Sequence, residues 1–202
     1  MIEEDVIEEG NFLDFNGDYI ENLKFSECDF NKFYDYMEID NCIFKNCKFL
    51  NGVYQGLDIS KCLFSFSNLS NVKFNDRSYD KIIFDNCTLV GVDFTNSYLD
   101  NIKFINCNLN YCNFSGCNLN SITFDNCSIK DSYFNEIKKK KITFLDCDLS
   151  GGEFLHFSLK DLDFSSCNIS DIRVDINNLK GVSVNLEQAL ELSLLLGIKI
   201  KE

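Results

Sequence analysis

Residues 107–120 read Cys-Asn-Leu-Asn-Tyr-Cys-Asn-Phe-Ser-Gly-Cys-Asn-Leu-Asn, with a large apolar residue at every fifth position. The same period extends in both directions, from Phe44 to Val184, and Lys139 is the exception. An α-helix has 3.6 residues per turn and a strand alternates every two, so neither keeps residues five apart on one buried line for this length. A fixed short period of this extent is typical of a solenoid.

A second period, of twenty residues, indicates the cross-section of the solenoid. Phenylalanine recurs every twenty residues along two lines, with mostly leucine or isoleucine on the two lines between them. The phenylalanine lines are Phe44, Phe64, Phe84, Phe104, Phe124, Phe144 and Phe164, and Phe74, Phe94, Phe114, Phe134 and Phe154. Four five-residue segments therefore make one four-sided coil, and stacked coils would pair like parallel strands about 4.8 Å apart. We predict an all-β solenoid, a quadrilateral parallel β-helix, followed by a C-terminal α-helix.

The eleven cysteines all stand two residues before a large apolar position. Five of them form one line with the twenty-residue period: Cys87, Cys107, Cys127, Cys147 and Cys167. A zinc site needs pairs two to four residues apart, and these spacings do not supply them. The acidic start of the chain differs from a secretion signal, which argues against a disulfide framework. We predict reduced cysteines packed inside a cytoplasmic protein.

The length, composition and net charge limit the classes of protein to which the chain can belong. With 202 residues, 45% of them hydrophobic, it can bury the core of a single domain. There is no run of eighteen apolar residues, so we expect no membrane span. The formal net charge of −13 argues against direct binding to nucleic acid. The predicted organisation is an acidic N-terminal arm or partial cap over residues 1–14, a β-helix over 15–184, and a helix with a tail over 185–202.

Two features of the repeat concern its corners. Asparagines recur in register beside the cysteine line, at Asn46, Asn86, Asn106 and Asn126. Asparagine tolerates tight turns, and stacked amides can bond to one another, so we predict a structural role for them. From Phe30 to Ile39 there are nine residues instead of ten, which predicts a bulge or tightened corner over residues 31–36.

Two stretches depart from the repeat on the same side of the predicted coil. One is Asp76-Arg77-Ser78-Tyr79, in which arginine occupies a small or apolar slot; the other is Lys138-Lys139-Lys140-Lys141. Because Lys139 falls on a core position and a buried unpaired lysine is costly, we predict that the backbone bulges and puts it in solvent. Exceptions in a regular scaffold are candidate partner contacts. The alternative is tolerated drift at a corner. Asp85 and Asp125, on outer faces, complete the candidate contacts.

Residues 185–197 leave the repeat and predict a helix. Asn185 is the expected N-cap, Gln188 completes a capping box, and Gly197 ends the segment. We predict that one set of residues caps the solenoid: Leu186, Ala189, Leu190, Leu194 and Ile198. A second set would remain exposed and form a two-fold homodimer through the C-terminal ends: Leu192, Leu195, Leu196 and Ile200. A purely intramolecular cap is the alternative.

Catalysis finds little support in the sequence. His156 is the only histidine and stands at an outward position. No serine or cysteine has a base placed by a recognisable motif, and there is no phosphate-binding loop. We therefore predict a protein that is not an enzyme, with no catalytic residues, no cofactor and no metal.

The repeats, such as residues 107–120, resemble the pentapeptide-repeat family over nearly the whole chain. That resemblance implies a right-handed four-sided β-helix. More narrowly, three stretches are similar to the Qnr group of quinolone-resistance proteins and their mycobacterial relative MfpA. They are residues 19–30 (Tyr-Ile-Glu-Asn-Leu-Lys-Phe-Ser-Glu-Cys-Asp-Phe), residues 148–154 (Asp-Leu-Ser-Gly-Gly-Glu-Phe) and the ending over residues 179–200.

The narrower resemblance implies a function. Those relatives dimerise through C-terminal helices, mimic duplex DNA in shape and charge, and bind DNA gyrase or topoisomerase IV. The register runs unbroken from residue 44 to 134, leaving no room for the projecting loops of Qnr proteins from Gram-negative bacteria, which are implicated in drug protection. We therefore expect a DNA-mimicking partner of a type II topoisomerase, with quinolone protection as a further possibility. The alternative is a pentapeptide-repeat scaffold that binds some other protein.

Overall fold

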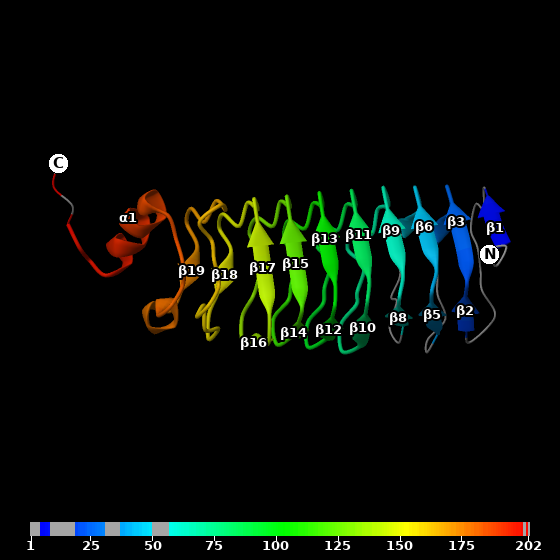
Figure 1. The fold of residues 1–202 in the computed structure, drawn as a ribbon, viewed down its shortest axis with the longest axis horizontal. Coiled ribbons are helices and arrows are strands. Elements are labelled where there is room, and N and C mark those ends of the chain that lie inside the picture. Colours follow the sequence, from blue (N-terminus) through cyan, green and yellow to red (C-terminus); the bar gives the residue numbers. More distant parts are fainter. Residues whose placement is uncertain (1–4, 9–18, 31–36, 50–56, 200, 202) are drawn as a thin grey trace.

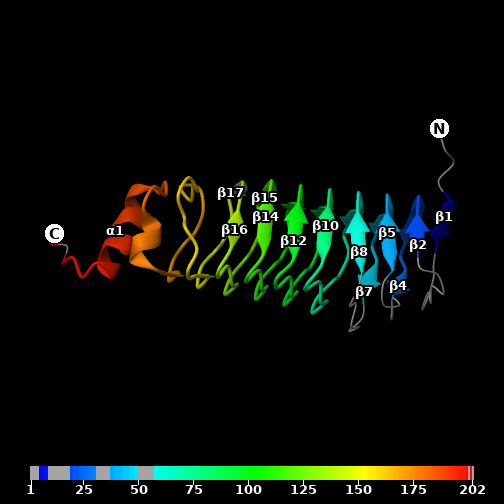
Figure 2. The same ribbon diagram turned by 90° about the horizontal axis from the view of Figure 1, so that it is seen from below.

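The computed structural model describes residues 5–8, 19–30, 37–49, 57–199 and 201. The chain winds into a straight tube of stacked coils, with helix α1 (Leu186–Leu195) beyond the last coil and strand β1 (Asp5–Glu8) at the opposite end (Figure 1 and Figure 2). All of the strand pairs are parallel, as successive turns of one winding chain require. The predicted four-sided parallel β-helix with a C-terminal helix is confirmed.

Two sheets form two of the four sides. The eight-stranded sheet runs β1, β3 (Leu23–Ser26), β6 (Ile43–Lys45), β9 (Leu63–Ser65), β11 (Ile83–Asp85), β13 (Lys103–Ile105), β15 (Ile122–Asp125) and β17 (Ile142–Leu145). The seven-stranded sheet runs β2 (Tyr19–Glu21), β5 (Glu38–Asp40), β8 (Asp58–Ser60), β10 (Ser78–Asp80), β12 (Tyr98–Asp100), β14 (Asn118–Asn120) and β16 (Lys138–Lys139).

The other two sides are held by shorter pairings. Strand β4 (Asp29–Phe30) pairs with β7 (Lys48–Phe49), and β18 (Glu153–Phe154) pairs with β19 (Arg173–Val174). Single bridges such as Asn68 with Thr88 continue these sides from coil to coil. A short 3-10 helix, η1 (Ile176–Leu179), precedes the end of the last coil.

The register of the sheets matches the two sequence periods. Phe84 pairs with Phe64 and with Phe104, twenty residues away in each direction. In the first coil the offset is nineteen, since Phe25 pairs with Phe44. The missing residue therefore falls between Phe30 and Ile39, as the count indicated. The corner proposed for it, at residues 31–36, lies outside the described residues.

The core consists of side chains stacked along the tube axis. The rings of Phe104 and Phe124 stack with centroids 4.9 Å apart, and Phe114 and Phe134 do the same on the opposite side. Rings of the two columns meet edge to face, with Phe104 and Phe114 centroids 6.3 Å apart. Both arrangements suit the quadrupole of the ring, which adds about 1 kcal/mol per pair to the burial of apolar area.

The cysteines fill the narrow part of the bore. All eleven are buried as thiols, and the interior Cys87–Cys167 line is present as predicted. The Sγ atom of Cys107 donates to the carbonyl oxygens of Phe84 at 3.4 Å and Ile105 at 3.2 Å. The Cys107 thiol thus fills a narrow slot and also satisfies its weak donor.

The corners adopt left-handed backbone conformations. Asn86, Asn106 and Asn126 have φ values of 52°, 53° and 51°. The Nδ2 atom of Asn126 donates to Oδ1 of Asn106 at 2.7 Å, so the predicted amide stack is present between these coils. Asparagine is favoured there because it adopts positive φ more readily than most residues.

Strand β1 continues the eight-stranded sheet beyond β3. Asp5 pairs with Leu23 and Glu8 with Ser26. Part of the N-terminal segment expected as an arm or partial cap therefore adds a strand to the open end of the tube. The rest of residues 1–14, apart from 5–8, lies outside the described residues.

The C-terminal helix begins and ends as predicted but turns a different face inward. Asn185 and Gln188 form the capping box, and the amide of Gly197 donates to Leu194 at 2.9 Å. Gln188 is buried and Leu192 packs against the core. The residues expected to cap the solenoid are instead exposed: Leu186, Ala189, Leu190, Leu194 and Ile198. The face prediction was wrong because it counted only apolar side chains and ignored the carbonyl groups left open at the last coil.

Candidate functional site

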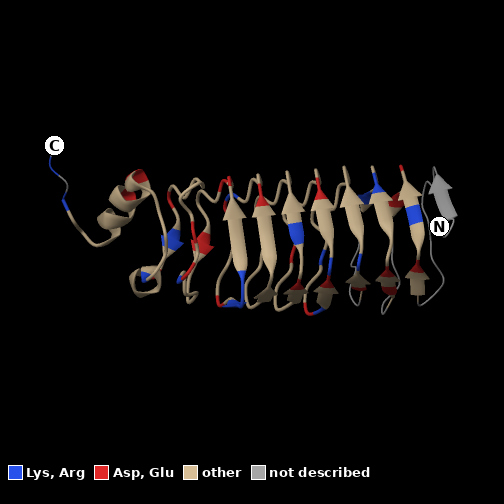
Figure 3. Ribbon diagram, viewed as in Figure 1, with Lys and Arg blue, Asp and Glu red and all other residues tan. Residues whose placement is uncertain are grey.

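The outer face of the seven-stranded sheet carries charges of opposite sign at its two ends (Figure 3). The acidic half, on β2 to β12, consists of Glu21, Glu38, Asp40, Asp58, Asp80 and Asp100. The basic half, from β16 into the next coil, consists of Lys138, Lys139, Lys140, Lys141 and Lys160. Between them, β14 presents only the uncharged Asn118 and Asn120. The face is therefore a candidate partner surface with a charge gradient along the tube.

Strand pairing aligns the acids of the acidic half along the tube. Glu21 pairs with Asp40, and Asp80 pairs with Asp100. Ser60 stands between Asp40 and Asp80 on the same line. Because coils are about 4.8 Å apart, this line presents a carboxylate on nearly every coil. Like charges at that spacing repel one another unless cations or hydrogen-bond donors offset them.

Two lysines and two polar side chains partly offset this charge. Lys61 Nζ lies 2.9 Å from Oδ2 of Asp40, and Lys81 Nζ lies 2.7 Å from Oδ2 of Asp80. Asn120 donates to Asp100 at 2.6 Å. Hydrogen bonds from the Ser60 hydroxyl and from Lys61 hold the pKa of Asp40 below its ordinary value. Asp40 therefore stays ionised at neutral pH.

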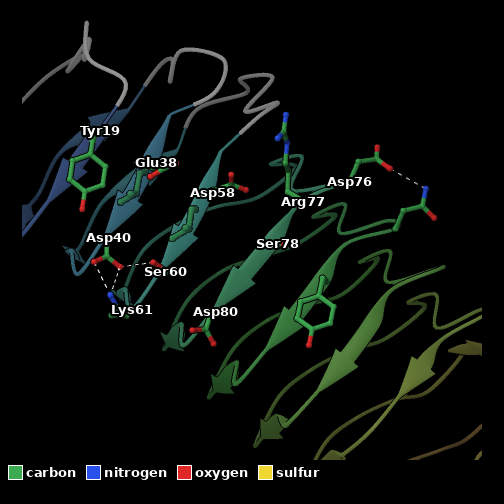
Figure 4. Close-up of a pocket in the computed structure, with 14 residues that line it drawn as sticks. Tyr19, Glu38, Asp40, Asp58, Ser60, Lys61, Asp76, Arg77, Ser78 and Asp80 are labelled. Carbon is green, nitrogen blue, oxygen red and sulfur yellow. Dashed lines mark hydrogen bonds and ion pairs between the residues drawn. The ribbon is translucent and has the colours of Figure 1, made fainter.

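The acidic half borders a shallow groove of about 750 Å³ (Figure 4). Its lining includes Tyr19 and Glu38 from the first coils, Asp58 from β8, and Arg77 and Tyr98 further along. The hydroxyl of Tyr19 donates to Glu21, and this bond raises the pKa of Tyr19 to about 12. The groove thus offers carboxylates, phenol groups and one guanidinium to a partner, which suits recognition of a polar, mainly cationic surface.

The first predicted contact stretch is a corner and a strand rather than a loop. Asp76 is exposed at the corner with φ of 60°, and Ser78 begins strand β10 with its side chain exposed. Arg77 is half-buried and lines the groove. Tyr79 is only 3% exposed, because it stands on a core line between Ile59 and Leu99. The prediction that Tyr79 contacts a partner was therefore wrong.

The second predicted stretch also keeps the strand register. Lys138 and Lys139 form β16, and Lys139 pairs directly with Leu119 of β14. The expected bulge is absent: Lys139 stays on its core line, and its long side chain carries the ammonium group outward, where Nζ donates to the carbonyl of Lys160. Lys138, Lys140 and Lys141 are exposed, as a contact role requires.

Asp85 and Asp125 lie on the eight-stranded sheet, apart from the other candidates. Each is half-buried, and both stand on one register line, separated by Ile105. Asn86 donates to Asp85 at 2.8 Å. The structure thus assembles residues 76–78 and the lysines on one face, and places Asp85 and Asp125 on another.

Of the predicted dimer residues, Leu195 and Leu196 are exposed at 44% and 56%. Leu192 packs against the core instead, which corrects its expected exposure. Ile200 lies outside the described residues. The exposed apolar surface of α1 and the residues after it includes these two and four others: Leu186, Leu190, Leu194 and Ile198.

The sequence interpretation missed the aligned acids of the acidic half and the role of Gln188. The signal for the acids was available, because the twenty-residue period applies to outward positions as well as to core lines. Glu38 and Asp58, for example, are twenty residues apart and pair in register. Nothing in the apolar pattern pointed to Gln188, because its partners are backbone carbonyls.

Among the described residues, neither metal-ligand clusters nor membrane-spanning helices are found. Within residues 5–8, 19–30, 37–49, 57–199 and 201, no group of three or more His, Cys, Asp or Glu side chains could hold a metal ion. Across the same ranges, no helix has both the length and the apolar character needed to cross a bilayer. His156, exposed at a corner, has Nδ1 3.6 Å from a carboxylate oxygen of Asp175.

Comparison with known proteins identifies the repeat. A family model described as the pentapeptide repeat region matches residues 37–114 and 79–154. Full-length QnrB1, a plasmid-mediated fluoroquinolone resistance protein, is 25% identical with a TM-score of 0.53, over 96% of this chain and 100% of that one. A trypsin-treated variant of QnrB1 is 27% identical over 97% of both chains, with a TM-score of 0.45. A search of the curated proteins finds no match.

Proposed function

Because the chain belongs to the pentapeptide-repeat family, we propose that it is a binding protein without catalytic activity that occupies the DNA-binding surface of a type II topoisomerase. The partner would be DNA gyrase or topoisomerase IV. The observation that carries this proposal is the likeness to full-length QnrB1 along 96% of the chain. A protein that confers fluoroquinolone resistance and has this fold is expected to act at the target of the drug, which is the topoisomerase.

The acidic half supplies the electrostatic part of the proposal. Its carboxylates repeat from coil to coil at about 4.8 Å, and duplex DNA also presents a regular series of negative charges to a basic surface. Glu38 and Asp58 make no ion pair among the described residues, so their charge is available to a partner. The mechanism is competition with DNA through shape and charge, with no bond made or broken.

We infer that two chains associate through α1. Leu186 is 77% exposed and Leu194 is 61% exposed, on a helix whose inward face is already occupied by Gln188 and Leu192. Several exposed aliphatic side chains close together on one helix indicate a protein–protein association surface. A two-fold dimer would cover them and give a rod of about 80 Å, from about eight coils of about 4.8 Å in each chain. Leu194→Glu with Leu196→Glu should convert the dimer to a monomer in light scattering.

Supercoiling by purified gyrase, with and without ciprofloxacin, tests the proposed partner. The wild-type chain should bind gyrase in a pull-down and inhibit supercoiling or restore it in the presence of the drug. Glu38→Lys with Asp58→Lys should abolish these effects. Asp85→Lys with Asp125→Lys is the matched control, since it makes the same charge change on the eight-stranded sheet. If the wild-type chain does not bind gyrase, does not inhibit it and does not protect it, the topoisomerase proposal fails. The alternative is then a scaffold that binds another protein.

The proposal also requires the protein to be cytoplasmic, where topoisomerases act on DNA. Eleven buried thiols without a disulfide suit a reducing compartment.

A further inference from the structure

The seven-stranded sheet stops at β16, in the middle of the basic half. The amide of Lys138 donates to Cys117 at 3.0 Å and that of Lys140 to Leu119 at 2.9 Å, as in a regular coil. Toward the next coil the ladder is interrupted: within the described chain, no backbone hydrogen bond joins residues 138–141 to residues 158–160. Backbone N–H and C=O groups on both sides of this interruption, which we call the gap, therefore lack their usual partners in the ladder.

Lys139 is the cause of the interruption. Leu119 precedes it and Leu159 follows it on the same core line, where an ammonium group cannot be buried without a large penalty. In a regular coil a corner amide bonds to the following coil, as Lys81 does to the carbonyl of Asp100 at 3.0 Å. Here the Nζ atom of Lys139, instead of a backbone amide, donates to the carbonyl of Lys160 in the following coil.

The gap opens into a groove of about 440 Å³ beside the interrupted strands. Four lysines line it: Lys139, Lys140, Lys141 and Lys160. The Nζ atom of Lys139 also lies 5.7 Å from the ring centroid of Phe157, a buried residue in the floor. The one acidic side chain in the lining is Asp161, so the groove has a strong positive excess.

None of the lysines of this groove forms an ion pair within the described chain, although Asp161 in the lining attracts Lys139. Every ion pair found there involves other cations, and in the acidic half both Lys61 and Lys81 are paired with aspartates. Desolvation by burial lowers the pKa of Lys139, which indicates an ammonium group only partly compensated by its surroundings. A charge cluster of this kind has free energy to gain from an anionic ligand.

We propose that this groove binds an extended acidic segment of a partner protein. Such a peptide uses both features of the site. Its carboxylates pair with the lysines, and its backbone can bond to the groups left open beside β16, as an added strand does at a sheet edge. A phosphate ligand would use the lysines and amides but leave the open carbonyls unpaired. The observations therefore favour a peptide.

This inference does not rest on the topoisomerase proposal. If one partner covers the whole face, its surface must be basic where it meets the acidic half and acidic where it meets the basic half. A rigid length of duplex DNA, which is negative along its whole length, could satisfy the requirement opposite the basic half but not the one opposite the acidic half.

Fluorescence anisotropy with a fluorescein-labelled decapeptide of alternating glutamate and threonine tests the site at about physiological salt. The full chain should bind it saturably, while a decapeptide of alternating lysine and threonine should not bind. Lys140→Glu with Lys160→Glu should weaken binding about tenfold or more. Lys103→Glu, an exposed lysine of the eight-stranded sheet, is the control and should change it little.

A second variant closes the gap and leaves most of the positive charge in place. Lys139→Leu should close the ladder toward residues 158–160 and weaken binding, although three lysines of the groove remain. Absence of saturable binding by the folded wild-type chain would overturn the proposal, as would equal weakening by the Lys103 control. Tighter binding of tripolyphosphate or of a duplex oligonucleotide at the same lysines would overturn the assignment to a peptide.

Discussion

The Nε2 atom of Gln188 donates to the backbone oxygen of Cys167 at 2.6 Å and thereby closes the last coil of the solenoid. The same atom donates to Phe164 at 2.8 Å, and Asn185 donates to Ser165 at 3.0 Å. Carbonyls that would bond to a following coil are thus satisfied by two side chains at the start of α1. A polar face turns inward because the end of a β-helix exposes polar backbone as well as apolar core.

Gln188→Leu should lower the free energy of unfolding by about 2 kcal/mol, measured by urea denaturation. The variant keeps the side-chain volume but loses the capping-box bond and leaves two carbonyls without a donor. Glu191→Leu, at an exposed position of the same helix, is the control and should change stability little. Equal stability of the two variants would mean that water replaces the glutamine at no cost.

Tyr79→Phe should raise the free energy of unfolding by about 1 kcal/mol. The Tyr79 hydroxyl is buried without a hydrogen-bond partner among the residues that the structure describes, and burial raises the pKa of this phenol. Removing an unpaired buried hydroxyl while keeping the ring relieves its desolvation penalty. Tyr98→Phe, at an exposed ring, should be neutral. A destabilised Tyr79→Phe protein would show that the hydroxyl has a partner, such as an enclosed water.

Lys139→Leu should stabilise the fold by about 1 kcal/mol at neutral pH, since leucine matches Leu119 and Leu159 on that core line. Desolvation lowers the pKa of Lys139 in the folded protein, so the unfolded chain binds this proton more readily. The wild-type penalty is therefore present at neutral pH and relieved as the pH approaches the ordinary lysine value. The advantage of Lys139→Leu should shrink toward pH 10.5. An advantage that grows with pH would contradict this account.

Asn106→Ala should destabilise the protein by about 1–2 kcal/mol, and Asn106→Gly should do so by less. Both variants lose the amide bond with Asn126, but only alanine is strained at the positive φ of this corner. Thermal unfolding of the two variants separates the contributions. Identical melting temperatures would show that the backbone conformation contributes nothing.

The solenoid should lose stability in alkali through its thiols. Burial raises the pKa of Cys117 to about 12, above the value near 9 expected in the unfolded chain. The stabilising contribution is therefore complete below about pH 9 and declines between about pH 9 and 12 as unfolded thiols ionise. Urea midpoints across this range should fall, and fall less for Cys117→Ala. Ellman's reagent should react with the thiols only in denaturant; rapid reaction of the native chain would contradict their burial.

Much of the fold could be predicted from the sequence because every coil of a solenoid packs against the next through residues at the same positions. The five-residue and twenty-residue periods predicted the core lines, the buried thiols and the asparagine corners. Even the missing residue before Ile39 was visible as a change in count, and the nineteen-residue offset between Phe25 and Phe44 confirms it. Each of these features depends on residues that meet at a fixed spacing along the chain.

The candidate site was predicted only in part, and the failures have two physical causes. Tyr79 and Lys139 both stand on core lines, yet the ring is buried while the lysine carries its charge out along a flexible stem. A count of positions alone does not separate these outcomes. The inward face of α1 was mistaken because its partners are backbone atoms, which the pattern of side chains does not display.

The sequence by itself determined the coil length of the tube, the side chains that fill it and the position of the C-terminal helix, because every coil packs against the next in the same way. Only the tertiary structure decided how charges and open backbone groups are shared between coils. Whether the ladder closes beside Lys139, and which side of α1 covers the last carbonyls, depends on the competition between burying charge, satisfying hydrogen bonds and covering apolar surface. That competition is resolved between atoms of neighbouring coils, at distances that periodicity does not specify.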